Sequence, residues 1–191
     1  MELKRVVVTG LGAVTPVGNT PEETWKNLLE GKSGAAPITH FDTTLFKTKF
    51  ACEVKDLNLN DYIDRKEARK MDRYCQLAMV SAAQGIKDAG LDLEKEDLNR
   101  IGVVFGVGIG GIKTFQDEVV YYGQHEDQGP KFNPFFIPKM IADIASGQIS
   151  IQYGFHGPNY TTTSACASSS NALADAFNLI RLGKANIIVS G

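Results

Sequence analysis

Short, apolar, β-branched runs recur along this chain, and a segment of helical periodicity separates each from the next. The runs are Arg5–Gly10, Arg100–Gly108, the threonine run that begins at Tyr160, and Ala185–Gly191. Fully apolar runs of this length are typical of parallel strands that are buried on both faces. The alternation therefore predicts an α/β fold with a mainly parallel sheet that is covered by helices on both sides.

The segments between these runs carry helix signals. Thr20, Pro21 and Glu23 form a capping box with proline at the first helical position, which predicts a helix that ends at Gly31. Apolar periodicity and stop signals predict further helices over 65–89, 112–122 and 138–151, and from Cys166 to Leu182. We expect an irregular chain over 32–60, with short strands around 49–54. The chain ends on an apolar strand, so we interpret residues 1–191 as one truncated domain of a longer architecture.

Composition excludes several classes of partner. The chain has 191 residues, 43% of them hydrophobic, and a formal net charge of −2, so nothing global indicates nucleic acid or an anionic membrane. The short apolar run at the N-terminus lacks the h-region of a signal peptide, and no other run approaches membrane-spanning length, so we expect neither kind of segment here. Three cysteines argue against a disulfide framework and favour a reduced, cytoplasmic compartment. The three histidines, His40, His125 and His156, lack metal-ligand spacing, and we predict no metal site.

Two glycine-rich loops follow predicted strands. In the first, Gly10, Gly12 and Gly18 do not satisfy the Gly-x-Gly-x-x-Gly fingerprint of dinucleotide-binding proteins, because Thr15 stands where the third glycine is needed. The second loop, "GVGIGG", fails in a similar way. We favour structural turns for both loops. An NAD-dependent oxidoreductase remains an alternative that detectable NAD(P)H binding would support.

Cys166 lies between the threonine run and a predicted helix. A thiol at the start of a helix feels the partial positive charge of the unpaired amides, which favours the thiolate. The Cys166 amide can also point at an oxyanion, and Ala165 and Ala167 leave room for a substrate. The pattern fits a nucleophile or a buried structural cysteine. For Cys52 and Cys75, by contrast, we predict core packing.

A basic run marks the start of the long predicted helix. Lys66, Arg69, Lys70 and Arg73 stand at helical spacing and would share one face. Such a face is either solvated or a docking site for an acidic partner.

Together these segments closely resemble β-ketoacyl-acyl-carrier-protein synthase II, a decarboxylating condensing enzyme of the thiolase fold. The resemblance runs from residue 5 to residue 191. It is carried by the motifs "RVVVTGLGAVTPVGN", "HFDT", "RKEARKMDR", "IGVVFGVGIGG", "NPFFIP" and "GPNYTTTSACASS". It implies the first half of a duplicated, layered α/β core, a homodimer, and a role in fatty acid biosynthesis.

The resemblance also implies roles for individual residues. Cys166 matches the nucleophile that accepts an acyl group from acyl-carrier protein, and its amide matches one oxyanion donor. Basic residues of the run match carrier-docking positions, and three apolar residues match the acyl pocket or a segment reaching the neighbouring subunit's pocket. The docking positions are Lys66, Arg69 and Lys70, and the pocket positions are Ile109, Phe136 and Ile137.

The same resemblance implies no resident cofactor, because phosphopantetheine arrives on the carrier. Two histidines and a lysine of the family's second half are absent from this sequence, so we expect no condensation by these residues alone. Ser168 and Ser169 stand near a position where many members have glycine, and we expect altered packing there. A polyketide-type ketosynthase is one alternative. A non-catalytic chain-length partner is another, although such partners lack the nucleophilic cysteine.

Overall fold

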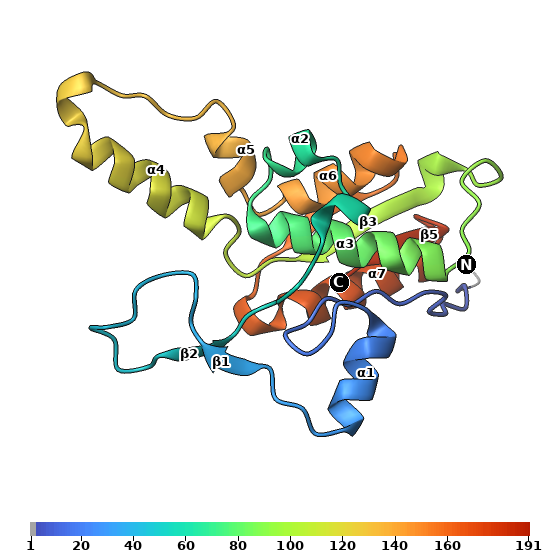
Figure 1. The fold of residues 1–191 in the computed structure, drawn as a ribbon. Helices are drawn as coiled ribbons and strands as arrows, with labels where there is room; N and C mark the ends of the chain where they lie inside the picture. Colours follow the sequence, from blue (N-terminus) through green and yellow to red (C-terminus); the bar gives the residue numbers. More distant parts are fainter. Residues whose placement is uncertain (1–2) are drawn as a thin grey trace.

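The computed structural model describes residues 3–191 and confirms the predicted α/β class. A three-stranded parallel sheet lies at its centre, with β3 (Ile101–Gly106) between β4 (Asn159–Thr162) and β5 (Ile187–Ser190) (Figure 1). In the register, Gly106 lies opposite Thr162. The three strands therefore end at one common edge.

Helices cover the two faces of this sheet. Ile101, Val103 and Phe105 of β3 pack in one apolar cluster with residues of α3 (Arg73–Asp88) and α6 (Ile144–Tyr153). Side chains alternate along a strand, so Gly102, Val104 and Gly106 point to the opposite face. On that face, α7 (Ser168–Arg181) packs against β3 and β5. The predicted layering of helix, sheet and helix is thus present (Figure 1).

Smaller elements surround this core. Two groups extend away from it: the β1–β2 hairpin, and the α4–α5 arm (Figure 1). Within residues 3–191, no helix is both long and apolar enough to cross a bilayer. The remaining elements are α1 (Pro21–Leu29), β1 (Ala35–Pro37), β2 (Phe50–Cys52), η1 (Leu59–Asp61), α2 (Arg65–Ala68), η2 (Leu98–Arg100), α4 (Ile112–Gln124), η3 (Glu126–Gln128), α5 (Phe136–Met140) and η4 (Ala165–Ala167).

The start of α1 is capped as the sequence predicts. The Glu23 amide donates to Thr20 Oγ1 at 3.2 Å, and the Glu23 carboxylate accepts from the Asn19 amide at 2.7 Å. Gly31 follows the helix with a φ of 68°, the left-handed conformation that glycine adopts without strain.

The prediction of a strand over Arg5–Gly10 is wrong. This segment has no strand pairing, although the Lys4 amide donates to the Arg181 carbonyl at 3.0 Å. Its glycine end packs directly on the backbone of α3. A Cβ added at Gly12 would lie 1.9 Å from the Ser81 carbonyl oxygen. Only the glycine end of this region therefore packs against a helix, while Val7 and Val8 are exposed. An apolar pattern alone does not show whether a segment has a pairing partner.

Two predicted long helices are each divided. The helix predicted over 65–89 consists of α2 and α3, and each part has its own aspartate N-cap, Asp64 and Asp72. The helix predicted over 138–151 consists of α5 and α6, separated at Ile141, whose backbone is extended. Capping side chains satisfy the first amides of a new helix, so Asp72 favours a break before α3 although the apolar pattern continues, whereas α6 begins without a side-chain cap.

Candidate active site

Cys166 lies beyond the carboxyl edge of the parallel sheet. It follows β4, and the neighbouring strand β3 ends opposite Thr162. The Val107 amide donates to the Thr162 carbonyl at 3.0 Å, so the two chains leave the sheet side by side. The loop after β3 contains Ile109, which is 72% exposed. Ligand sites of parallel sheets form at this edge, and the topology brings the predicted nucleophile and one predicted pocket residue to it.

The Cys166 side chain is exposed at the tip of a tight turn. The turn η4 is closed by the Ala167 amide, which donates to the Ser164 carbonyl at 3.1 Å, and α7 begins directly after it. Ala165 has a φ of 50°, which is unusual for a residue with a side chain. Among residues 3–191, no group accepts a hydrogen bond from the Cys166 amide. The thiol and this amide are thus both available to a substrate.

The other two cysteines have different surroundings. Cys75 is fully buried in α3, as predicted, and burial raises the pKa of its thiol to about 12, with a further contribution from Asp72. A protonated, enclosed thiol is not a nucleophile. Cys52 is exposed, so the prediction of core packing is wrong there. It belongs to the two-stranded β1–β2 hairpin, which forms a sheet separate from the central one.

The predicted docking residues lie on a short helix and the turn after it. Lys66 belongs to α2 and Arg69 follows it, and both are exposed. Lys70 Nζ lies 2.6 Å from Glu67 Oε1 and 5.8 Å from the centre of the Phe135 ring. Because α2 ends at Ala68, the predicted single helical face that continues to Arg73 is not present. The basic residues nevertheless lie in one surface segment, in which Lys70 forms an ion pair with Glu67.

Asp72 joins this basic segment to the α4–α5 arm, a connection that sequence reasoning missed. Its buried carboxylate accepts hydrogen bonds from the Thr114 amide at 3.1 Å and the Thr114 hydroxyl at 2.5 Å. The neighbouring Tyr74 hydroxyl donates to the Ile141 carbonyl at 2.5 Å, and burial raises the pKa of Tyr74 far above its usual value. An aspartate before a helical run signals an N-cap, but nothing local signals Thr114 as a partner.

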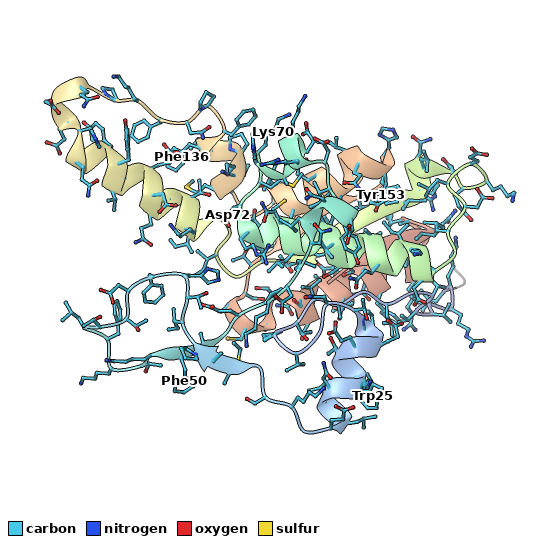
Figure 2. All side chains as sticks on the ribbon, viewed as in Figure 1. Trp25, Phe50, Lys70, Asp72, Phe136 and Tyr153 are labelled. Carbon is cyan, nitrogen blue, oxygen red and sulfur yellow. The ribbon has the colours of Figure 1, made fainter. Side chains whose placement is uncertain are left out.

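Phe136 lies in an aromatic group within the arm. Its ring is 6.3 Å from that of Phe115 and 5.6 Å from that of Phe132, measured between centroids. Ile137 is 53% exposed. Figure 2 shows Phe136, Lys70 and Asp72 on the side of the molecule where α2, α4 and α5 meet. The role of Phe136 and Ile137 in a neighbouring subunit's pocket stays a prediction.

The glycine-rich loops have packing roles. A Cβ at Gly10 would lie 2.2 Å from the Gly85 carbonyl oxygen, on α3. Gly110 has a φ of 94°, and the Gly111 amide donates to the Met140 carbonyl at 2.9 Å, at the end of α5. These close approaches account for the glycines without a bound dinucleotide, as the interpretation of both loops as structural turns expects.

A parallel sheet between helices presents a thiol at its carboxyl edge, just before a helix, which is the arrangement that the resemblance to thiolase-like condensing enzymes implies. The comparisons with known proteins agree. Residues 3–191 match the family of the β-ketoacyl synthase N-terminal domain, and the chain belongs to this family.

Relatives and solved structures give the same assignment. The chain is 44% identical over 189 residues to 3-oxoacyl-[acyl-carrier-protein] synthase 2 of Staphylococcus aureus (strain COL), covering 98% of this chain and 45% of that protein. It is 46% identical to the Synechocystis protein of the same name, with 100% and 45% coverage. The chain thus spans about 45% of the length of these relatives. The ishigamide ketosynthase/chain length factor aligns with a TM-score of 0.90 at 28% identity, over 99% of this chain and 47% of that chain.

Proposed function

We propose that this chain carries the acyl-accepting nucleophile of a 3-oxoacyl-acyl-carrier-protein synthase II, which elongates fatty acyl chains in fatty acid biosynthesis. The observation that supports this most directly is the exposed Cys166 at the carboxyl edge of the sheet, whose own amide has no hydrogen-bond acceptor among residues 3–191. Relatives of that name at 44% and 46% identity over nearly the whole chain support the substrate class.

In the first step, the Cys166 thiolate attacks the carbonyl carbon of an acyl-carrier-protein thioester. A bond forms between that carbon and Sγ, and the carbonyl oxygen becomes an oxyanion that accepts a hydrogen bond from the Cys166 amide. The bond to the phosphopantetheine sulfur then breaks, and the carrier leaves as a thiol after taking up a proton. The product of this step is acyl-Cys166.

In the second step, malonyl-carrier protein loses CO₂, and the resulting enolate carbon attacks the acyl carbonyl. A carbon–carbon bond forms, the bond to Cys166 Sγ breaks, and the 3-oxoacyl product leaves on the carrier two carbons longer. The family places the groups that stabilise this enolate in its second half, so this chain's residues contribute the acyl acceptor and one oxyanion donor.

The carrier protein is acidic and would dock on the basic segment of Lys66, Arg69 and Lys70. Electrostatic complementarity of this kind raises the rate of encounter. Phosphopantetheine reaches the site on the carrier, and the proposed function needs no resident cofactor. We include in the proposal a homodimer, a cytoplasmic location, and assignment of residues 1–191 to the synthase N-terminal domain.

A polyketide ketosynthase is the second candidate. The favouring observation is the match to a chain in the structure of a type II polyketide acyl-carrier protein in complex with its ketosynthase. The TM-score is 0.82 at 25% identity, over 99% of this chain and 51% of that chain. The higher identity to the relatives named 3-oxoacyl-[acyl-carrier-protein] synthase 2 favours fatty acid synthesis.

Transfer of an acyl group to the chain tests the proposal. The protein is incubated with acyl-carrier protein that bears a saturated long-chain acyl group, and intact mass is followed with time. We expect one acyl adduct, located on the Cys166 peptide and absent from Cys166→Ala. Cys52→Ala is the matched control, because Cys52 is also exposed. An adduct that persists in Cys166→Ala, or no adduct on the folded chain, would contradict the proposal.

A further inference from the structure

Ser168 is a buried polar residue beside the exposed Cys166. It is the first residue of α7, and 3% of its surface is exposed. Its hydroxyl accepts a hydrogen bond from the Ser164 amide at 2.9 Å and donates to the Ala165 carbonyl at 2.7 Å. A contact of 3.5 Å to the Val107 carbonyl is longer and weaker. One side chain therefore binds the backbone on the amino-terminal side of the Cys166 turn.

The backbone of Ser168 is itself held by the sheet. The Thr162 hydroxyl at the end of β4 donates to the Ser168 carbonyl at 2.8 Å. At the end of β3, a Cβ added to Gly106 would lie 2.3 Å from the Ser168 carbonyl carbon, so strand and helix start are in direct contact. Ser168 thus connects the rigid edge of the sheet to the turn that presents the thiol.

The carbonyl that Ser168 binds belongs to the same peptide unit as the Cys166 amide. That unit is planar and trans, so its C=O and N–H point in opposite directions. Because the Ala165 carbonyl accepts from both the hydroxyl and the backbone amide of Ser168, it points into the protein. The Cys166 amide must then point the other way. Hydrogen bonds to the carbonyl also polarise the unit and strengthen its N–H as a donor.

The backbone conformation needs such support. Ala165 has a φ of 50°, and this left-handed conformation is unfavourable for a residue with a side chain. Strained residues of this kind persist only where the surrounding contacts fix them. The Ser168 hydroxyl contacts the residue on either side of the strained torsion, through the Ser164 amide and the Ala165 carbonyl.

We propose that Ser168 is a positioning residue that orients the Ala165–Cys166 peptide unit as oxyanion donor for the thioester carbonyl. This inference rests on the proposed function, since it assigns a role in acylation of Cys166. The role assigned to Ser168 depends on the hydrogen bonds of its hydroxyl, and not on the small size of the side chains that follow Cys166.

Two reactions of the same thiol separate positioning from general damage. Acylation by an acyl-N-acetylcysteamine thioester passes through an oxyanion, whereas alkylation by iodoacetamide does not. For Ser168→Ala we expect acylation of Cys166 to slow by about 10- to 100-fold, somewhat less than the loss of a whole oxyanion donor, while alkylation changes little. Ser169→Ala and Ser170→Ala remove exposed hydroxyls from the same turn of α7 and should leave both rates unchanged. Ser168→Thr keeps the hydroxyl and should restore acylation.

Equal loss of both reactions in Ser168→Ala, or no change in either, would overturn the inference.

Amide hydrogen exchange at Ser164 gives an independent test, because this amide donates to the Ser168 hydroxyl. We expect its exchange to be faster in Ser168→Ala and unchanged in Ser169→Ala, and unchanged exchange in Ser168→Ala would refute the hydrogen bond. If the wild-type chain is not acylated at all, the proposed function is contradicted. Hydrogen exchange at Ser164 then still tests whether the Ser168 hydroxyl holds the turn. If Ser168→Ala does not fold, the Ser168→Thr variant replaces it in the test. A folded Ser168→Thr that is acylated at the wild-type rate supports the inference, and a folded Ser168→Thr that is acylated more slowly overturns the role of the hydroxyl.

Discussion

At the scale of single residues, the three cysteines have three different environments. Cys166 and Cys52 are exposed, and Cys75 is buried with its thiol pKa raised to about 12. Alkylation requires both access and the thiolate. In the folded chain at pH 8, we therefore expect iodoacetamide to modify Cys166 fastest, Cys52 more slowly, and Cys75 not at all until urea unfolds the protein. Peptide mass spectrometry measures the three rates, and equal rates in the folded state would contradict this ordering.

Asp72 supports a second prediction at this scale. Its replacement by alanine leaves the Thr114 amide and hydroxyl without their buried acceptor and removes the N-cap of α3. We expect Asp72→Ala to lower the free energy of unfolding by about 2–4 kcal/mol. Asp64→Ala removes a comparable but exposed cap from α2, and should cost about 1 kcal/mol. Urea denaturation compares the two, and similar losses would refute a special role for the buried contact.

The sequence was sufficient to predict Cys166 as a candidate nucleophile, because a cysteine between a strand and a helix is a local pattern. The hydrogen bonds that orient the site are less visible in the sequence. Ser168 acts through backbone groups of the turn, and its position at the start of α7 brings it into contact with Gly106 of β3. Asp72 and Thr114 are 42 positions apart. Such partners depend on the packing of elements, which residue patterns do not specify.

At the scale of elements, the packing of the glycine-rich segment on α3 can be tested. A methyl group at Gly12 would lie 1.9 Å from the Ser81 carbonyl oxygen, so the segment and the helix must separate. We expect Gly12→Ala to lower the free energy of unfolding by about 1–3 kcal/mol. Gly123→Ala is the control, because Gly123 lies in α4 with nothing within 4 Å of an added Cβ. It should be neutral or raise stability by up to about 1 kcal/mol, and equal effects would disprove the close contact.

The basic segment around α2 gives a second prediction for an element. Glu67 pairs with Lys70 and places a negative charge beside the proposed docking residues. We expect Arg69→Glu to weaken binding of acyl-carrier protein by about fivefold or more, and Glu67→Gln to strengthen it by a smaller factor. Both effects should diminish at high salt. Lys95→Glu, on an exposed lysine of another loop, is the control in titration calorimetry. Equal weakening by Arg69→Glu and Lys95→Glu would indicate a general charge effect and no defined docking site.

Element boundaries show which signals in the sequence are reliable. The start of α1 could be predicted because Thr20 and Glu23 form its cap within a few residues. The prediction of a strand at Arg5–Gly10 was wrong because this segment pairs with no strand among residues 3–191, and only its glycine end contacts α3. The break between α2 and α3 was missed because the apolar pattern continues across Asp72, whose capping role depends on geometry.

At the scale of the whole molecule, many large apolar side chains lie outside the core. Leu29 on α1 is 70% exposed, Leu45 in the β1–β2 hairpin is 97% exposed, and Phe115 in the α4–α5 arm is 43% exposed. Exposed apolar side chains mark contact surfaces where they form a contiguous patch, so these three groups are the candidates to test. The proposed homodimer would cover part of this surface.

Trp25 reports on this association, because it is the single tryptophan of the chain and is 64% exposed on α1. We expect the sedimentation coefficient of the chain to rise with concentration, and acrylamide to quench Trp25 efficiently in dilute solution.

Two variants then show which surface is covered: Leu29→Lys, next to Trp25 on α1, and Leu45→Lys, in the hairpin. Weaker association in one variant identifies the group that contributes, whereas a constant monomeric sedimentation coefficient at all concentrations would contradict association through any of the three groups. Quenching that stays efficient in the associated state would exclude α1 and leave the hairpin or the arm as the contact.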